Sequence, residues 1–263
     1  MIKIDKIDNK FYNKLIDAAF LAGTAYKKED RIEEVIRAKF SDFDLKILDH
    51  KMLKLRVLIL RKKKQVKIVI RGTSNLKNWI ETNFKFKKVD FDAANEKEKI
   101  HKGFDIASCE LWFLIQKYIN KDDELEFYGH SLGSAIGDIL KTTAYIEGYN
   151  VKEAWLFGTP KVGNYHYCKT SNDQDVLTIR VLNDLDLIFN APPFFFGYSS
   201  LNLAIYIKSD GELILYPNRL KVHSMRLTKL LRENKFEGLL ELAEDHDMKN
   251  YLIILKKLKN TIK

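Results

Sequence analysis

The chain has 263 residues, of which 46% are hydrophobic and 12% aromatic. This content can fill a buried core and excludes a globally disordered chain. The 45 Lys and Arg residues outnumber the 36 Asp and Glu residues and give a formal charge of +9. Basic and acidic segments alternate, so no nucleic-acid partner is expected. The two cysteines, Cys109 and Cys168, are too few for a disulfide framework or a zinc ribbon.

The beginning of the sequence, residues 1–14, interleaves charged and apolar positions. No later stretch offers the roughly 18 uninterrupted apolar residues of a membrane span. These patterns predict a soluble, intracellular protein without a Sec-type signal, with association at a membrane surface left open. No Gly/Ser- or Pro-rich linker divides the chain and no solenoid-type repeat is present, so a single domain over residues 1–263 is expected.

Hydrophobic periodicity predicts strands that alternate with helices. Residues 66–70 are almost continuously apolar and β-branched, as in a strand buried on both faces. The expected helices cover residues 11–26, 31–40, 103–119, 131–148, 224–234 and 247–260, and the expected strands cover 53–60, 66–70, 125–128, 154–157, 177–182 and a hairpin at 203–207 and 213–216 that turns at 209–211. This order predicts an α/β fold with a mostly parallel central sheet, flanked by helices and extended by antiparallel strands at its edges.

The segment Gly129-His130-Ser131-Leu132-Gly133 forms a Gly-x-Ser-x-Gly motif directly between a predicted strand and a predicted helix. In that place the two glycines permit a sharp, strained turn that exposes the serine above the sheet. Ser131 is therefore the candidate nucleophile, and the Leu132 N–H at the start of the helix is a candidate oxyanion donor. The alternative is a glycine-rich connection in which Ser131 only caps the helix.

A serine nucleophile needs a histidine base. His246 is the best candidate, because it lies late in the chain in a polar loop before the last helix and so satisfies the order serine, acid, histidine. His101 and His223 remain possible. His130, inside the turn itself, is expected to point into structural packing.

The base in turn needs an orienting carboxylate. The predicted strand at 177–182 is followed by Asp184 and Asp186, which places both acids at the carboxyl end of a strand, where sites of open α/β sheets lie. A cap of a turn or helix is the alternative role for each. The residues alone do not choose between the two.

With these residues in place, the sequence resembles the class 3 lipases, the fungal-type triacylglycerol lipases and their plant and diacylglycerol-lipase relatives. The resemblance spreads over most of the chain and rests on seven segments in the order of the family. They are Ile70-Arg71-Gly72-Thr73, Asn78-Trp79-Ile80, His101-Lys102-Gly103-Phe104, Gly129 to Gly133, Phe157 to Asn164, Arg180 with Asn183, Asp186 and Pro192-Pro193, and His246 with Tyr251.

The resemblance implies further roles for individual residues. It selects Asp186 over Asp184 as the acid, and makes Thr73 the second oxyanion donor beside Leu132. It also implies a lid over about residues 75–83, where Leu76, Trp79 and Ile80 fall at helical spacing and form an apolar face. A short core-packed helix is the alternative for that segment.

The sequence thus predicts an α/β-hydrolase that cleaves carboxylic esters of lipids through an acyl-enzyme, without cofactor or metal. Its expected partners are a lipid or ester substrate and an anionic membrane surface drawn by the positive charge. A phospholipase A1, a short-chain esterase and a catalytically silent lipid-binding module are the alternatives.

The sequence departs from the family pattern at Ser134 and Thr82. These departures affect what can be expected of the lid and of the substrate preference, but not of the triad. The aromatic run Phe194 to Phe196 suits an acyl-site wall, a membrane-facing rim or core packing.

Overall fold

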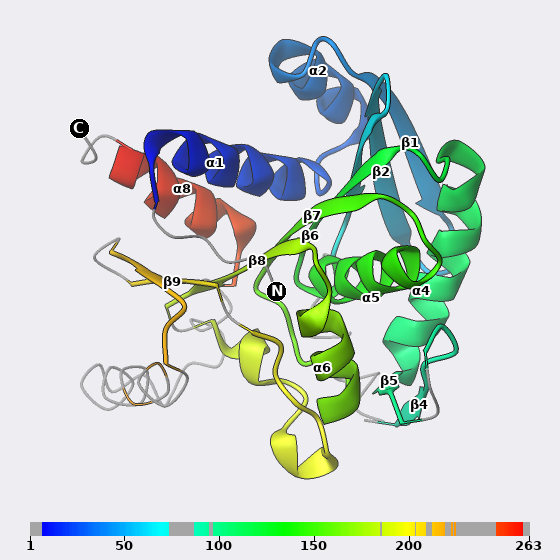
Figure 1. Ribbon diagram of the computed structural model, residues 1–263. Coiled ribbons are helices and arrows are strands. Elements are labelled where there is room, and N and C mark those ends of the chain that lie inside the picture. Colours follow the sequence, from blue (N-terminus) through cyan, green and yellow to red (C-terminus); the bar gives the residue numbers. More distant parts are fainter. Residues whose placement is uncertain are drawn as a thin grey trace.

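The computed structural model describes residues 7–73, 87–94, 97–184, 186–202, 204–208, 212–218, 222, 224 and 246–259. The elements in these ranges, shown in Figure 1, are α1 (Asn9–Thr24), α2 (Glu29–Lys39), β1 (Asp44–His50), β2 (Leu55–Lys62), β3 (Gln65–Ile70), β4 (Lys88–Asp90), β5 (Lys99–His101), α4 (Lys102–Ile115), η1 (Gln116–Tyr118), β6 (Glu124–His130), α5 (Leu132–Ile146), β7 (Val151–Phe157), α6 (Tyr165–Asp173), β8 (Leu177–Asn183), η2 (Leu187–Asn190), η3 (Phe194–Phe196), β9 (Ile205–Ile207), β10 (Leu213–Leu215) and α8 (Met248–Lys259).

An eight-stranded sheet, in the order β1-β2-β3-β6-β7-β8-β9-β10, runs through the described part of the chain. The central pairs of this sheet, β3–β6, β6–β7, β7–β8 and β8–β9, are parallel, and β4 and β5 form a separate two-stranded antiparallel sheet. The pairs β1–β2, β2–β3 and β9–β10 are antiparallel and lie toward the two edges. This arrangement confirms the predicted α/β class with a mostly parallel centre. Parallel neighbours need long crossover connections, which helices such as α5, between β6 and β7, provide.

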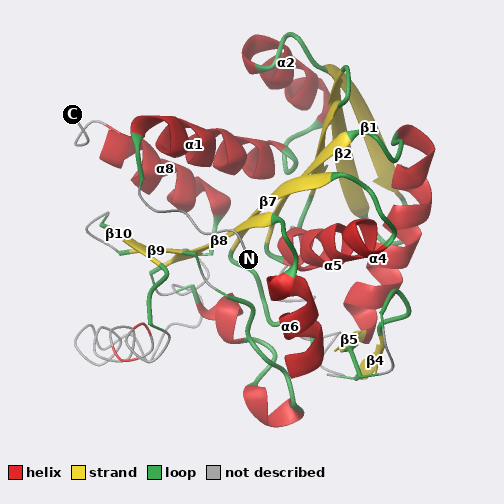
Figure 2. Cartoon of the chain, viewed as in Figure 1, coloured by secondary structure: helices red, strands yellow, loops and turns green. Residues whose placement is uncertain are grey.

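Helices cover the sheet on both faces (Figure 2), with α1 and α8 on one side and α4 and α5 on the other. Successive side chains of a strand point to opposite faces. On β6, Phe127 therefore packs in the core beneath α4 and α5, whereas the next residue, Tyr128, packs in the core shared with α1 and α8. The sheet is buried between two apolar layers, and its central strands end at an edge where loops can converge.

Some elements differ from those expected. Strand β1 is not predicted by the sequence pattern, because its side chains, as those of an edge strand, are exposed or only half-buried. Helix α6 is not predicted either, although Asn164 supplies a recognisable start signal by accepting a hydrogen bond from the Tyr167 N–H. The predicted hairpin is confirmed by the β9–β10 pair. Its turn at 209–211 and the expected helix 224–234 lie outside the described residues, save for 224.

Candidate active site

Ser131 lies in a sharp turn between β6 and α5, with φ 57° and ψ −129°. This positive φ is one that a non-glycine residue seldom adopts, and such strain costs about 1–3 kcal/mol and persists only where the surroundings impose it. The two flanking glycines make room for the turn. A Cβ on Gly129 would lie 2.4 Å from the Gly133 carbonyl oxygen, and one on Gly133 would lie 2.2 Å from the Ile70 carbonyl oxygen. Strand β3, strand β6 and helix α5 therefore meet more closely here than side chains would allow.

Ser131 lies at the beginning of α5. The Ser131 backbone N–H donates to the Phe157 carbonyl at 3.0 Å, which fixes the turn to β7. The first N–H groups of a helix, here beginning with Leu132, have no partner within the helix and favour negative charge. The Ser131 Oγ is buried and makes no hydrogen bond to any described residue. A buried hydroxyl without a partner costs free energy, so it calls for an explanation beyond packing.

Asp186 and His246 form a buried pair at the same edge of the sheet. The His246 Nδ1 lies 2.8 Å from the Asp186 Oδ2. The Tyr251 hydroxyl, from α8, donates to the same oxygen at 2.7 Å, and the Ile188 N–H donates to Oδ1 at 3.0 Å. Gly158 makes room for the pair, because a Cβ there would lie 2.7 Å from Asp186 Oδ2 and 2.9 Å from His246 Nδ1.

The electrostatics of this pair set the charge of the carboxylate. Burial raises the pKa of Asp186, but the charge of His246 and the hydrogen bonds from His246 and Tyr251 outweigh it and hold the pKa below its ordinary value. The carboxylate is therefore ionised and accepts a hydrogen bond from the His246 Nδ1–H, so that in the neutral ring the lone pair lies on Nε2. The Nε2 atom is buried and has no hydrogen-bond partner in the described part of the chain.

The site residues predicted from the sequence converge only in part. The ring of His130, the residue before Ser131, stacks on the ring of His246 with centroids 4.6 Å apart. A Cβ on Gly72 would lie 3.3 Å from the Ser131 Cβ, so the following residue, Thr73, borders the same turn. No hydrogen bond joins the Ser131 Oγ to the His246 Nε2. In unliganded enzymes such contacts are often long and shorten when substrate binds.

The buried ring of His130 lies in structural packing, as expected, and also connects Tyr26 with the backbone of His246. The His130 Nε2 lies 2.6 Å from the His246 carbonyl oxygen, and Nδ1 lies 2.8 Å from the Tyr26 hydroxyl. Burial and the neighbouring His246 lower the pKa of His130 to about 3, so the ring is neutral. Its Nε2–H then donates to the His246 carbonyl, and Nδ1 accepts from Tyr26.

Tyr26 is a site residue that the sequence analysis did not find. A Cβ on Gly72 would lie 2.2 Å from its hydroxyl oxygen, and Gly72 donates a backbone hydrogen bond to it. Tyr26 thus connects the segment before Thr73 with His130 and, through it, with His246. In the sequence Tyr26 only continues the apolar stripe of α1, so no signal distinguishes it from a core residue.

The other candidates lie elsewhere. His101 caps α4, since its Nδ1 accepts the Gly103 N–H at 3.0 Å. Asp184 faces β9, where its Oδ1 accepts the Tyr206 hydroxyl at 3.1 Å. His223, the expected lid over 75–83 and its residues Leu76, Trp79 and Ile80 lie outside the described residues. No three His, Cys, Asp or Glu side chains among the residues described converge in a metal-binding cluster.

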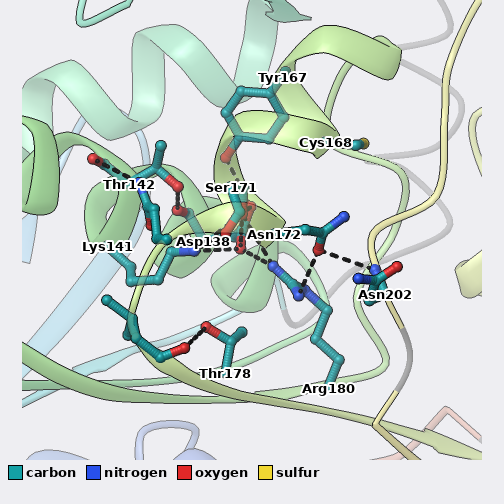
Figure 3. Close-up of polar contacts among 12 residues, drawn as sticks. Asp138, Lys141, Thr142, Tyr167, Cys168, Ser171, Asn172, Thr178, Arg180 and Asn202 are labelled. Atoms are coloured by element: carbon teal, nitrogen blue, oxygen red, sulfur yellow. Dashed lines mark hydrogen bonds and ion pairs between the residues drawn. The ribbon is translucent and has the colours of Figure 1, made fainter. Parts of the chain in front are cut away.

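A buried ionic network behind the site joins α5, α6 and β8 (Figure 3). Asp138 of α5 accepts from the Arg180 guanidinium of β8, from the Tyr167 hydroxyl at 2.7 Å and from the Ser171 hydroxyl at 2.9 Å. Lys141 donates to the Ser171 carbonyl at 2.9 Å. Since α5 begins after Ser131 and β8 ends before Asp186, the network fixes the two elements that carry the nucleophile and the acid candidates.

The charges of the network are unequal, with one carboxylate for two cations. Burial raises the pKa of Asp138, but Arg180 and Lys141 outweigh it and keep the pKa below its ordinary value. Burial lowers the pKa of Lys141 to about 8, although Asp138 opposes this shift. Lys141 therefore loses its proton more readily than an ordinary lysine does.

Similarity to known proteins points to one family. The class 3 lipase family model matches residues 67–196. A secreted mono- and diacylglycerol lipase of Fusarium solani is 30% identical over 144 residues, which are 52% of this chain and 42% of the relative. Phospholipase A1-IIgamma of Arabidopsis thaliana is 26% identical over 188 residues, 56% of this chain and 44% of the relative. The matches thus span less than half of each relative.

Solved structures agree on the fold. A triacylglycerol lipase whose catalytic centre is a serine-protease triad superposes with a TM-score of 0.64 at 20% identity, covering 80% of this chain and 84% of the other. A lipase of Rhizopus microsporus var. chinensis superposes with a TM-score of 0.61 at 21% identity, covering 77% and 76%. These likenesses show the α/β-hydrolase fold.

Two findings bear on the expected location. Within the described ranges, no helix combines the length and apolar character needed to cross a membrane. The Fusarium solani relative is a secreted protein by name, so the expected intracellular location receives no support.

Proposed function

This chain belongs to the class 3 lipase family, and from that premise we propose that it is a serine hydrolase that cleaves carboxylic ester bonds of lipids. The proposal is carried by the geometry around Ser131. Its backbone is strained and its hydroxyl has no hydrogen-bond partner among the described residues. The buried Asp186–His246 pair leaves the His246 Nε2 likewise without a partner there. A serine, a base and an orienting acid form the set that acyl transfer requires.

In the proposed first step, the Ser131 Oγ attacks the ester carbonyl carbon while His246 Nε2 accepts the hydroxyl proton. Asp186 holds the ring through Nδ1 and stabilises the imidazolium that forms. The negative charge on the carbonyl oxygen is met by the Leu132 N–H at the start of α5 and by Thr73, which follows Gly72 at the edge of the same turn. The neutral His130 beneath His246 adds no repelling charge.

The intermediate then collapses. His246 returns the proton to the departing alcohol oxygen, and the acyl group stays on the Ser131 Oγ. Water, deprotonated by the same Nε2, attacks the acyl-enzyme, and the free acid leaves with Ser131 restored. Every proton in this cycle passes through one nitrogen, so the position of the His246 ring governs both halves of the reaction.

The proposed substrates are acylglycerols, because one relative is named a mono- and diacylglycerol lipase. A phospholipase A1 is the second candidate, since the Arabidopsis thaliana relative bears that name. Two further parts of the proposal rest on the sequence, namely a single-domain organisation and a lid over 75–83. We also propose contact with anionic membrane surfaces, because the chain has a charge of +9 and basic residues in and near the expected lid. Of these residues, Lys87 and Lys88 are described by the structure, and Lys77 and Lys85 lie outside the described residues.

A fluorophosphonate probe tests the chemistry. We expect it to label the wild-type chain at Ser131 and to leave Ser131→Ala unlabelled, with both proteins melting at similar temperatures. A folded wild-type protein that resists the probe would instead indicate the lipid-binding module. A panel of esters that varies acyl length and head group then separates an acylglycerol lipase from a phospholipase A1 and from a short-chain esterase.

A further inference from the structure

The turn η3 presents three consecutive aromatic side chains to solvent. Phe194, Phe195 and Phe196 are 76%, 71% and 43% exposed. Core packing, one of the roles that the sequence left open, is therefore wrong for these residues. Monomeric proteins rarely expose contiguous apolar patches, and those that do use them to bind partners, ligands or membranes. In Figure 1 the yellow segment that contains η3 lies at the lower edge of the molecule.

This aromatic turn is held in one shape. Pro192 and Pro193 restrict the backbone before it, and Gly197 closes it in a left-handed conformation, with φ 74° and its N–H donating to the Phe194 carbonyl at 2.8 Å. The rings pack on each other, with centroids 4.7 Å apart for Phe195 and Phe196. A preformed apolar wedge loses little conformational entropy when it binds, which strengthens association.

The wedge, defined as Phe194–Phe196, lies close to the site in the chain. Only the short turn η2 and residues 191–193 separate it from Asp186. Strand β4 holds the wedge from another part of the chain. The Lys88 ammonium of β4 donates to the Phe196 carbonyl and lies 4.6 Å from the centre of the Tyr198 ring. The exposed Lys87 precedes Lys88. Apolar rings thus project outward, and cations lie at their base.

This layering matches a lipid surface, in which the acyl chains lie beneath a layer of phosphate groups. Phenylalanine rings favour the acyl boundary, and lysines favour the phosphates. We propose that the wedge is an interfacial anchor that inserts into the lipid surface carrying the substrate, with Lys87 and Lys88 at the depth of the headgroups. The inference rests on the proposed function and names the partner that the site faces. A protein partner would not require cations at the base of an apolar tip.

Vesicle binding tests the anchor. The full chain carrying Ser131→Ala, which prevents hydrolysis, is mixed with phosphatidylcholine vesicles containing phosphatidylglycerol, and the bound fraction is measured by sedimentation. Loss of one inserted aromatic ring should weaken partitioning about tenfold, so Phe195→Ser should show that loss. Phe195→Trp should keep the affinity, and its added fluorescence should be quenched by brominated lipid.

Phe113→Ser is the matched control, because Phe113 is 65% exposed on α4, away from the wedge. It should leave vesicle binding within about twofold of the parent.

In the catalytically intact chain, the Phe195→Ser variant should hydrolyse a soluble ester as the wild type does and melt at the same temperature. Equal binding losses at Phe113 and Phe195, or none at Phe195, overturn the anchor, as does a change confined to the oligomeric state. A wild-type chain that binds vesicles through Phe195 but hydrolyses no ester refutes the proposed function and leaves the anchor standing.

Discussion

At the scale of single residues, the hydrogen bonds to Asp186 determine what a substitution there removes. Its Oδ2 accepts from His246 and Tyr251, and an amide in its place would present an N–H to a ring nitrogen that already carries a proton. Asp186→Asn should thus favour the wrong tautomer of His246. In a Ser-His-Asp enzyme this change lowers kcat by about 10⁴-fold, and we expect a loss of similar size with the fold intact.

Asp184→Asn is the matched comparison. Its Oδ1 accepts from Tyr206 on β9, and an asparagine oxygen can accept the same bond, so activity should stay within about twofold of wild type. Steady-state kinetics on a soluble ester measure both variants. Equal losses would show that the acid has been assigned to the wrong residue.

Tyr26 offers a second test at this scale. Tyr26→Phe removes the donor to His130 Nδ1 and leaves a buried acceptor unpaired, at a cost of about 1–3 kcal/mol. Because His130 holds the carbonyl of His246, kcat should fall while KM changes little. Tyr206→Phe also removes a buried hydroxyl and should lower stability comparably without this fall in kcat. If Tyr26→Phe lost stability but kept kcat, its link to His246 would be structural only.

The candidate site residues differ in how well they can be predicted from the sequence. The Gly-x-Ser-x-Gly spacing between a predicted strand and a predicted helix indicates Ser131 but leaves a helix cap as the alternative, and the structure shows no capping hydrogen bond from its side chain. Choosing Asp186 over Asp184 needed the family resemblance, since both follow the same strand. Tyr26 could not be predicted, because its role depends on the approach of Gly72 and His130, which are distant in sequence.

At the scale of elements, the network between α5, α6 and β8 predicts a pH dependence of stability. The pKa of Lys141 is lowered in the folded protein from 10.5 to about 8. Between these values the unfolded chain binds more protons at this residue, so its contribution to the free energy of unfolding increases as the pH rises. Denaturant unfolding at several pH values should show wild type gaining stability relative to Lys141→Met over this range. A constant difference between the two proteins would mean that Lys141 keeps its proton.

The elements themselves were predicted unevenly. The strand β6 and the helix α5 were found within a few residues, because glycines mark the turn between them. The strand β1 has no predictive pattern, because its edge position leaves none of its side chains fully buried. The short pair β4 and β5 was not expected either, because three-residue strands leave no periodic pattern.

At the scale of the whole molecule, the +9 charge predicts electrostatic attraction to anionic lipid. Each basic group near such a surface contributes about 1 kcal/mol, and salt screens it. Hydrolysis of substrate in anionic vesicles should therefore fall as salt rises, whereas hydrolysis of a soluble short-chain ester should change little. The ratio of the two rates across a salt series is the measurement, and a constant ratio would refute the attraction.

The exposure of the phenylalanine wedge shows where prediction from sequence stops at this scale. A run of three aromatics suits a core as well as a surface, and only the folding of η3 against β4 places Phe194 to Phe196 in solvent. Net charge, by contrast, is read directly from composition.

The contact between His130 and the carbonyl of His246 joins residues 116 positions apart, and it has a consequence for synthesis on the ribosome. Translation proceeds from the N-terminus, so the strands up to β8 and the turn that bears Ser131 emerge before His246 and α8. The nascent chain has the proposed nucleophile, Ser131, but lacks the proposed base until α8 docks on α1, where the Tyr12 hydroxyl donates to the Leu255 carbonyl. On the proposed function, ester hydrolysis therefore requires that the segment bearing His246 and α8 has been made and has packed on α1.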